Sequence, residues 1–298
     1  MILVVLMYAA FAATFPLAKL AVAQTTSPLF FLALRMLCAG LGMLFYSLLV
    51  QKERPKLTTT DFFDLVSAGF FAIFVAFGFE FWAIQYVSSV KVNIFYSLSP
   101  FVTALLARIT GQEQLSARKI VGLCIGFGGM IPLSLNALGN GISAQIFPTS
   151  LYDGALLISV ISAAYAWFII KRLINRGYPL LFINGAMTLL GGLMCGVAHI
   201  YSYSGVFAPV YSWPSLLLYM SLLIMISNVL GYTMYGMLLR KYSLTFLSFS
   251  GFMCPLFGML YGFLLMGEPF SMTYILSLGC VFAGLSLFYW DEQISNRA

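Results

Sequence analysis

The stretch FYSLSPFVTALLARITGQEQLS (95–116) recurs in outline as SFSGFMCPLFGMLYGFLLMGEPFS (248–271), with matched residues 155 positions apart. In each copy a proline lies inside an apolar run, and a glutamate and a serine follow that run. The matched pairs are Pro100 with Pro255, Glu113 with Glu268, Ser116 with Ser271 and, just beyond, Gly129 with Gly284. Near the start of each half, AAFA (9–12) also matches AAYA (163–166). The chain therefore contains an internal repeat.

The composition indicates an integral membrane protein. Of the 298 residues, 61% are hydrophobic, 16% are aromatic and only 8% are charged, and the mean hydropathy is +0.97. A soluble core could not bury this much apolar surface, so most side chains must face hydrocarbon or one another. The five cysteines lie singly in apolar segments and there is one histidine, so the sequence predicts no disulfide framework and no metal site.

Ten apolar runs are each long enough to cross a bilayer as an α-helix, which needs about 20 residues. Segments such as TTSP (25–28), QKERPKLTTTD (51–61) and GEPFS (267–271) separate them. The predicted spans are 2–22, 28–50, 62–86, 88–110, 119–138, 151–172, 179–201, 215–239, 243–266 and 272–290. We expect an all-α integral membrane protein with ten transmembrane helices.

The lysine and arginine residues predict the orientation. Twelve of the fifteen lie in the loops after spans 2, 4, 6 and 8 or in the C-terminal tail, and the loops after spans 1, 5, 7 and 9 contain none. By the positive-inside rule, both termini are expected in the cytoplasm and the chain in the cytoplasmic (inner) membrane. The net charge of +6 thus reflects topology, and nucleic-acid binding is not expected.

Five spans in each half place the two copies of the repeat in opposite orientations, because an odd number of crossings reverses the side of entry. We expect a five-helix repeat at 1–138, an inverted repeat at 151–290 and a cytoplasmic tail at 291–298. Inverted repeats that meet around a cavity at the membrane midplane are typical of secondary transporters.

With these features the chain resembles the EamA-type permeases of the drug/metabolite transporter superfamily. The resemblance covers nearly the whole chain and is carried by AAFAATFPLAKLAV (9–22), FLALRMLCAG (31–40), the stretch 83–130 and LLMGEPFSMTYILSLGCVFAGLSL (264–287). It implies alternating access around a cavity lined by spans 1, 3, 4, 6, 8 and 9. The cargoes of such proteins include amino acids, nucleotide-linked metabolites such as S-adenosylmethionine, sugars and drugs. Glu80 departs from the apolar or neutral residue usual in this region of the family.

No motif of an enzyme is visible. The sequence has no G-x-x-x-x-G-K-[S/T], no G-x-S-x-G and no H-E-x-x-H, and no nucleophile or metal-ligand set stands out. We therefore predict that the chain is not an enzyme and has no cofactor. Transport requires instead a site that replaces the hydration of the cargo and two conformations of similar energy.

Glu80 and Lys91 are charges within or beside apolar spans. A carboxylate in a span is usually turned to the interior, where it marks a substrate or proton path. The alternative is a structural ion pair between Glu80 and Lys91 across the hairpin of spans 3 and 4. Both roles are compatible, since a substrate ammonium could displace Lys91 as the partner of Glu80.

Span 4 and span 9 carry related polar positions. Asn93, Tyr96 and Pro100 recur at spacings of three and four, and Ser248 and Pro255 are the repeat partners of Asn93 and Pro100. A proline inside a span removes one hydrogen bond and frees a carbonyl, which is tolerated where the backbone lines a cavity. These positions are therefore candidates for the binding site, with simple helix packing as the alternative.

Further candidates lie on spans 2, 6 and 8. Asn228, Tyr232 and Tyr235 form a polar stripe on span 8, and Tyr235 is the repeat partner of Glu80. Interhelical hydrogen bonding is the alternative for this stripe. Trp167 could stack on a flat cargo ring or belong to an interfacial aromatic belt. Arg35 could bind a cargo carboxylate in a bidentate manner or have a structural role.

These features predict a secondary active transporter of a small zwitterionic metabolite, either an amino acid or an adenosyl amino acid such as S-adenosylmethionine. One acidic and two basic groups suit an ammonium-plus-carboxylate ligand, and the aromatic residues suit a ring. The alternatives are an exporter of lipophilic or cationic drugs and a non-transporting membrane scaffold. Without an ATP-binding motif, coupling to protons or to an exchanged substrate is expected. Membrane lipids are the other expected partners, and the chain is expected to be a monomer or a homodimer.

The orientation can be tested by chemical labelling. Single cysteines introduced in the loops 139–150 and 202–214 should react with an impermeant thiol reagent from outside. Cysteines at 51–60 and 173–177 should be protected, because these loops carry the positive charges. Reversed accessibility would overturn both the orientation and the inverted repeat.

Overall fold

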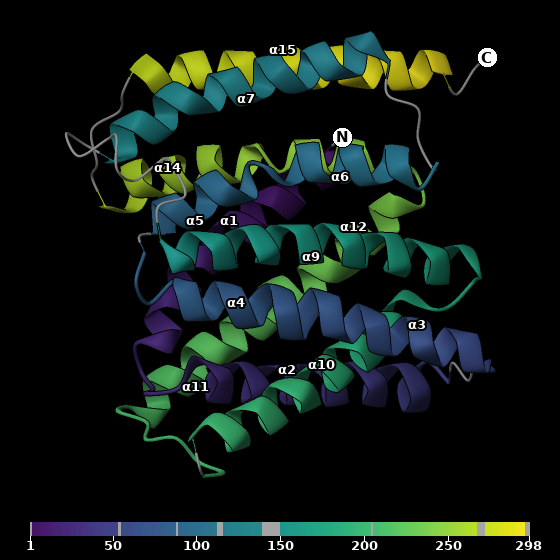
Figure 1. Cartoon of the computed structure of the whole chain (residues 1–298), viewed down its shortest axis with the longest axis vertical. Coiled ribbons are helices and arrows are strands. Elements are labelled where there is room, and N and C mark those ends of the chain that lie inside the picture. The colour runs from purple at the N-terminus through teal and green to yellow at the C-terminus, as the bar shows by residue number, and fades with distance from the viewer. Residues whose placement is uncertain are drawn as a thin grey trace.

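A computed structural model describes residues 2–52, 55–87, 89–111, 116–138, 150–203, 205–266 and 272–295, and within them the chain is helical apart from turns and one isolated β-bridge, Thr25 to Val210. Figure 1 shows the helices running side by side. In chain order they are α1 (Ile2–Val22), α2 (Pro28–Phe45), η1 (Tyr46–Val50), α3 (Thr59–Gly69), η2 (Phe70–Val75), α4 (Ala76–Ala83), α5 (Ser89–Tyr96), α6 (Ser99–Ile109), α7 (Ala117–Leu138), α9 (Leu151–Asn175), α10 (Leu180–Tyr203), α11 (Trp213–Leu223), η4 (Ile224–Gly231), α12 (Tyr232–Leu239), α13 (Leu244–Ser250), α14 (Met253–Met266) and α15 (Met272–Ser295).

These elements confirm the predicted membrane architecture. Within the described residues they group into ten rods at the ten predicted spans, because η1, η2 and η4 are π-helical continuations of the rods that contain them. Six rods are long and apolar enough to cross a membrane, and the remaining segments include shorter apolar helices. The first and second rods match the predicted 2–22 and 28–50, and other ends differ by a few residues.

Several helices begin where the sequence supplies a capping side chain. Ser27 accepts a hydrogen bond from the Phe30 amide, with Pro28 in the first helical turn. Thr58 and Ser150 start α3 and α9 with capping boxes, in which each hydroxyl and an aspartate three residues later satisfy each other's backbone N–H group. Such caps satisfy helix donors that have no partner within the helix.

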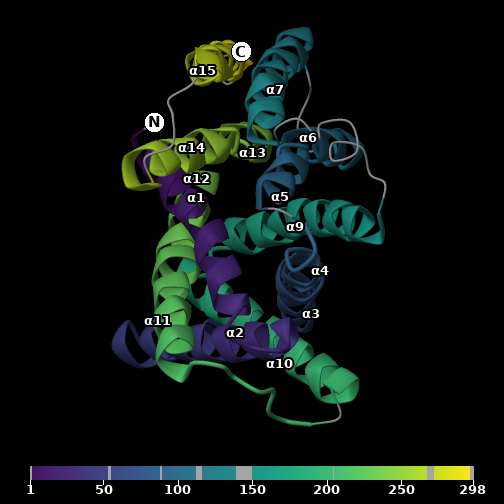
Figure 2. The ribbon, with the colours of Figure 1, turned by 90° about the vertical axis from the view of Figure 1, so that its left-hand side faces the viewer.

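The packing of the rods follows the internal repeat. In the second half, α10 and α15 correspond to α2 and α7 of the first half. Helix α10 packs along α2, and α15 packs along α7. These two pairs lie at opposite ends of the long axis of the molecule, with the other rods between them (Figures 1 and 2). Equivalent rods therefore meet across an approximate twofold relation, as an inverted repeat requires.

Irregular backbone also repeats. The π-helix η2 occupies 70–75 in the third rod, and η4 occupies 224–231 in the eighth, so the two overlap at the 155-residue offset. The fourth rod is interrupted by a turn at 97–98, between α5 and α6, and the ninth by a turn at 251–252, between α13 and α14. Each half thus contains one rod with a π-helical segment and one rod interrupted by a turn, at matching positions of the repeat.

The structure corrects the expected role of the two prolines. Pro100 and Pro255 lie in the first turns of α6 and α14, so each follows a break and begins a new helix. In a first turn the missing N–H of proline would have had no helical partner in any case. Hydrogen bonds of the i to i+3 type close the turns, such as Leu98 N–H to the Phe95 carbonyl at 3.0 Å and Phe252 N–H to the Phe249 carbonyl at 3.1 Å.

Glycines allow α7 and α15 to approach closely. A Cβ on Gly284 would lie 2.5 Å from the Gly122 carbonyl oxygen, and a Cβ on Gly129 would lie 2.4 Å from the Cys280 Cβ. Gly129 and Gly284 are the pair that the repeat matches, and both lie at this helix crossing. These glycines therefore allow backbone contact between equivalent rods.

Replacing Gly284 by alanine should destabilise the protein. The added methyl group meets backbone, which cannot rotate away, so we expect a loss of about 1–3 kcal/mol in the free energy of unfolding. The measurement is thermal unfolding in detergent. Gly279→Ala on the same helix is the control, because nothing lies within 4 Å of its new Cβ. Equal stability of the two variants would contradict this account of the contact.

Candidate functional site

A cavity of about 190 Å³ lies at the centre of the bundle. Its walls come from α1, η2 and α4, α5 and α6, α9, η4 and α12, and α13 and α14, with Met187 of α10 added. These are the spans 1, 3, 4, 6, 8 and 9 that the family resemblance implies. Both breaks border the cavity, at Ser97 and Ser99 in the fourth rod and at Gly251 in the ninth. Irregular backbone thus lies against a cavity, where it is tolerated at membrane depth.

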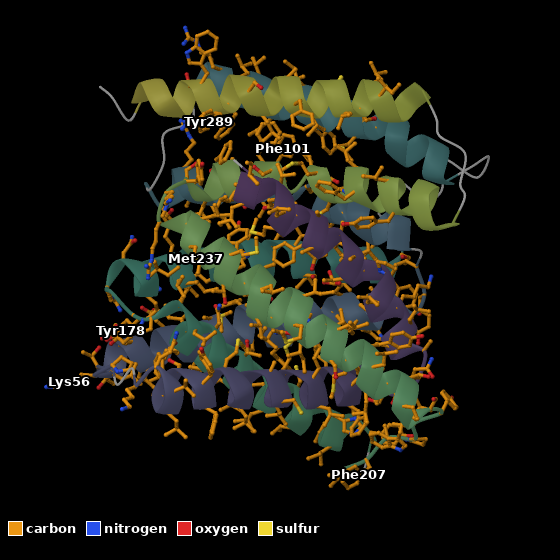
Figure 3. The ribbon with its side chains drawn as sticks, turned by 180° about the vertical axis from the view of Figure 1, so that it is seen from behind. Lys56, Phe101, Tyr178, Phe207, Met237 and Tyr289 are labelled. Carbon is orange, nitrogen blue, oxygen red and sulfur yellow. The ribbon has the colours of Figure 1, made fainter. Side chains whose placement is uncertain are left out.

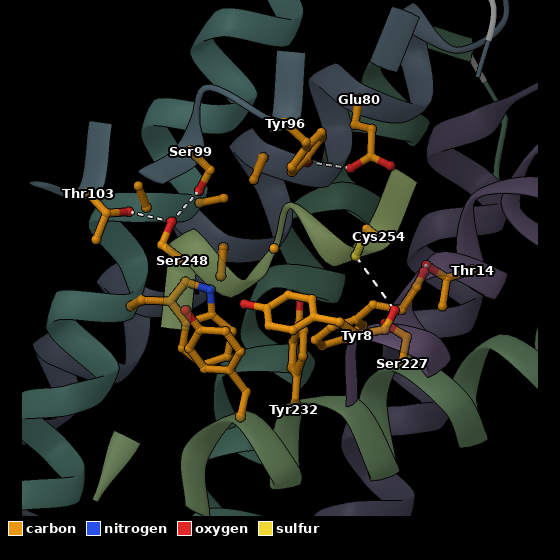
Figure 4. A pocket seen from close by; sticks show the side chains of 18 of the residues that line it. Tyr8, Thr14, Glu80, Tyr96, Ser99, Thr103, Ser227, Tyr232, Ser248 and Cys254 are labelled. Atoms are coloured by element: carbon orange, nitrogen blue, oxygen red, sulfur yellow. Dashed lines mark hydrogen bonds between the residues drawn. The ribbon is translucent and has the colours of Figure 1, made fainter. Parts of the chain in front are cut away.

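Glu80 faces this cavity and is 4% exposed. The Tyr96 hydroxyl donates a hydrogen bond to Glu80 Oε2 at 2.5 Å (Figure 4). Tyr96 also lies 3.0 Å from Ser159 Oγ, and Ser159 donates to the Ala76 carbonyl at 2.8 Å. Among the described residues that line the cavity, Glu80 is the one charged side chain. The cavity therefore presents a single carboxyl group held by hydroxyl groups of two other rods.

Arg35 lies behind the cavity wall. The guanidinium is fully buried and donates from Nε and Nη2 to Asn228 Oδ1, at 3.1 and 2.9 Å. It also lies 5.8 Å from the centre of the Phe77 ring, and Phe77 lines the cavity. Arg35 and Glu80 interact electrostatically, although the hydrogen bonds of Arg35 go to η4 and α11. Arg35 and Asn228, two predicted site residues, thus bind each other.

The predicted ion pair between Glu80 and Lys91 is wrong. Lys91 Nζ lies 2.8 Å from an oxygen of Asp153, in the first turn of α9. Glu80 instead accepts its hydrogen bond from Tyr96. The sequence did not point to Asp153, because its position 62 residues away and at the start of an apolar span gave no signal of contact. Lys91 is absent from the described lining of the cavity.

Aromatic residues of α9 and span 8 form part of the cavity wall. Trp167 stacks on Tyr235 with ring centres 3.9 Å apart, and Tyr232 meets the same indole edge-on at 5.5 Å. All three line the cavity. Tyr235, the repeat partner of Glu80, also faces the cavity from the other half.

The broken rods meet through hydroxyl groups. Ser248 of α13 lies 3.0 Å from Ser99 Oγ and accepts from Thr103 at 3.1 Å, both of α6 (Figure 4). The structure therefore brings the predicted Ser248 and Tyr96 to one cavity. The side chain of Asn93 lies outside the described residues.

The first helix supplies wall residues that the sequence reasoning missed. Tyr8, Phe11, Thr14 and Phe15 all line the cavity. The Tyr8 hydroxyl donates to the Leu247 carbonyl, which joins α1 to α13. The stretch AAFAATFPLAKLAV (9–22) carried the family resemblance, but neither it nor Tyr8 before it forms a polar stripe, so the sequence did not single out these side chains.

A second polar cluster lies at the end of the bundle predicted to be cytoplasmic. Arg172 and Arg176 at the end of α9 pair with Asp64 and Asp61 of α3, at 2.7 and 2.5 Å. The Tyr178 hydroxyl also donates to Asp61, and this hydrogen bond, followed by burial, raises the pKa of Tyr178. Figure 3 shows Tyr178 beside Lys56 at this end. The cluster joins the two halves away from the cavity.

A sequence model described as the EamA-like transporter family matches residues 1–135 and 151–290. The chain belongs to this family. As a transporter, it is not an enzyme. It is 28% identical over 283 residues to an S-adenosylmethionine/S-adenosylhomocysteine transporter of Chlamydia muridarum, a match that covers 94% of this chain and 88% of the relative.

Other proteins support the membership and the fold. An S-adenosylmethionine/S-adenosylhomocysteine transporter of Chlamydia trachomatis serovar L2 is 26% identical, in a match that covers 94% of this chain and 85% of the relative. The uncharacterized transporter YetK of Bacillus subtilis is 21% identical, covering 85% and 75%. A solved crystal structure superposes with a TM-score of 0.71 at 14% identity, over 96% of this chain and 93% of that one. This last likeness concerns the fold alone.

The Lys91–Asp153 pair predicts a stability phenotype in this transporter. Lys91→Met removes the ammonium that faces a fully buried carboxylate, so the free energy of unfolding should fall by about 3 kcal/mol. Denaturation in detergent measures the loss. The double variant Lys91→Met/Asp153→Asn removes both charges and should recover most of it. A normally stable Lys91→Met variant that has lost uptake would instead favour a role in transport.

Proposed function

We propose that this transporter is a secondary carrier that moves a small cationic or zwitterionic metabolite by alternating access. The substrate class that fits best is an adenosyl amino acid of the S-adenosylmethionine type. The observation that carries the proposal is Glu80, a carboxyl group buried in a cavity with aromatic walls and without another charged side chain in the described lining. We further propose the orientation that the basic loops predict, with both termini in the cytoplasm and the chain in the inner membrane.

The chemistry of such a substrate matches the cavity in two parts. S-adenosylmethionine carries a sulfonium, an ammonium and a carboxylate, and so has one net positive charge for Glu80 to balance. Its adenine ring can stack on aromatic side chains, and Trp167, Tyr232 and Tyr235 supply such faces. Cation–π attraction to these rings would add to the recognition of the sulfonium. The chlamydial relatives, which are named as S-adenosylmethionine/S-adenosylhomocysteine transporters, support this substrate class.

The substrate carboxylate needs a different partner from the one expected from the sequence. Lys91 is paired with Asp153, and Arg35 is bound to Asn228 behind the wall. The first turns of α6 and α14 both border the cavity, at Ser99 and at Pro255. Helix N-termini carry partial positive charge, and broken helices of transporters use them for substrate carboxylates. We assign the carboxylate to these helix ends.

A carrier of lipophilic cations is the second candidate. Lys91 and Arg35 are bound to Asp153 and Asn228, so neither is available for a substrate carboxylate. A ligand without a carboxylate needs only Glu80 and the aromatic residues of the cavity wall. The two candidates differ in whether a cation that lacks a carboxylate competes with S-adenosylmethionine.

Uptake into proteoliposomes tests the proposal. Labelled S-adenosylmethionine should be taken up, with neutral amino acids and quaternary amines as the comparison panel. Glu80→Gln keeps the shape and removes the charge, so uptake should fall roughly ten- to a hundredfold, since a hydrogen bond to a charged group contributes about 1.5–3 kcal/mol. Asp291→Asn, a carboxyl group that binds Ser116, is the control and should transport normally. Unchanged uptake in Glu80→Gln would remove Glu80 from the site.

A further inference from the structure

The contacts around Glu80 form a chain of four oxygen atoms. Glu80 Oε2 lies 2.5 Å from the Tyr96 hydroxyl, which lies 3.0 Å from Ser159 Oγ, which lies 2.8 Å from the Ala76 carbonyl oxygen. Ser159 is fully buried, and the chain joins α4, α5 and α9, one element from the second half and two from the first. All three separations are within hydrogen-bonding distance.

The number of protons in this chain depends on Glu80. Each hydrogen bond uses one proton, and a carbonyl oxygen supplies none. Tyr96 and Ser159 supply two protons for three contacts. With Glu80 ionised, one of the three contacts is left without a proton whichever way the two hydroxyl groups rotate. With Glu80 protonated, the hydrogen bond that Tyr96 gives to an ionised carboxylate reverses its direction. The Glu80 O–H then donates to Tyr96, Tyr96 donates to Ser159, and Ser159 donates to the Ala76 carbonyl, so every contact is filled.

We propose that Glu80 is protonated when the cavity is free of ligand, and that Tyr96 and Ser159 are positioning residues that hold this proton. A cationic group of the transported molecule then takes the place of the proton. The O–H bond of Glu80 breaks, the electron pair stays on the carboxylate, and the proton leaves to water in the cavity. Tyr96 turns its hydroxyl to donate to the carboxylate, and one proton is released for each cation bound.

Other groups near Glu80 fit this exchange. Tyr232 of α12 and Arg35 of α2 interact with Glu80 electrostatically. Arg35 gives its described hydrogen bonds to Asn228 and the Leu223 carbonyl, so it contributes charge without donating to Glu80. Its charge stabilises the carboxylate once the proton has left. A buried carboxyl group that is neutral without cargo also avoids the cost of an uncompensated charge at membrane depth.

The exchange deepens the proposed function, but its first test does not require a ligand. Infrared difference spectroscopy of the purified protein at pH 7, where an exposed glutamate is ionised, should show the C=O stretching band of a protonated carboxylic acid. This band should be absent in Glu80→Gln. An ionised Glu80 in the wild-type protein at this pH overturns the inference, whatever the protein transports.

Two serine variants separate the proton chain from ordinary packing. Ser159 and Ser162 both lie on α9 and both donate to a carbonyl of the third rod, those of Ala76 and Phe71. Ser159→Ala removes two hydrogen bonds from the protonated state and one from the ionised state. The pH at which the band is half lost should therefore fall by about half to one unit. Ser162→Ala should leave it unchanged, and an equal shift in both variants overturns the proposal.

Tyr96→Phe should shift the pH of half-loss less than Ser159→Ala does. It removes two neutral hydrogen bonds from the protonated state and one charge-assisted hydrogen bond, which is about twice as strong, from the ionised state, so the two losses nearly cancel. A larger fall in Tyr96→Phe than in Ser159→Ala would contradict the assignment. The Phe15 ring, which packs edge-on against Tyr96 at 5.9 Å, should hold the phenyl group in place.

The ligand step is measured with S-adenosylmethionine as the probe. In weakly buffered solution, binding to the wild-type protein should release about one proton per site, and binding that releases no proton overturns the exchange. If S-adenosylmethionine does not bind while the infrared band is present at pH 7, the proposed substrate is wrong and the protonation of Glu80 stands. The two failures are thus distinguishable.

Discussion

A charge at membrane depth must be paired, solvated or neutralised inside the protein, because hydrocarbon offers no partner. Three buried charges of this chain meet that requirement in three ways. Lys91 is paired with the carboxylate of Asp153. Arg35 is held by the amide oxygen of Asn228 and lies over an aromatic ring. Glu80 faces a cavity and is bound by Tyr96. The contacts of Lys91 and Arg35 each join a rod of the first half to a rod of the second, so these two buried charges also help to fix how the two halves dock.

The inverted repeat explains where the cavity forms but not its chemistry. Equivalent rods pack against each other at both ends of the molecule. The π-helical segments and the breaks of the rods between them fall at matching positions of the two halves. Within this symmetric frame the side chains differ. Glu80 corresponds to Tyr235, and the buried Arg35 corresponds to Leu190. The two halves therefore contribute different chemistry to the cavity, a carboxyl group from the third rod and an aromatic stack from the sixth and eighth.

The sequence alone was sufficient to predict the features that depend on a local pattern of residues. Apolar run length predicts the ten spans, and the proline and glutamate at a constant offset predict the repeat. Glu80, Tyr96, Trp167, Tyr232, Tyr235 and Ser248 were found because a polar or large aromatic group is unusual in such runs, and all of them line the cavity. Pairings between distant rods could not be found in this way. Lys91 was matched to the nearest carboxylate along the chain, whereas the fold places Asp153 of α9 beside it. The hydrogen bond from Arg35 to Asn228 likewise depends on how span 8 packs against span 2.

The pairs at the two ends of α9 differ in how much solvent they meet, and this bears on alternating access. At its start, Asp153 is fully buried against Lys91. Separating these two side chains would leave an unpaired charge in hydrocarbon or in the protein interior. At its end, Arg172 and Arg176 are about half exposed where they pair with the third rod. Water can replace such contacts at little cost, since exposed ion pairs contribute little to stability. The start of α9 thus contacts the fourth rod through Lys91, whereas its end contacts the third rod. The chain of oxygens from Glu80 to Ala76 also joins the third and sixth rods, through Ser159 of α9. Under the proposed exchange, the contact between the third and sixth rods therefore responds to the protonation of Glu80.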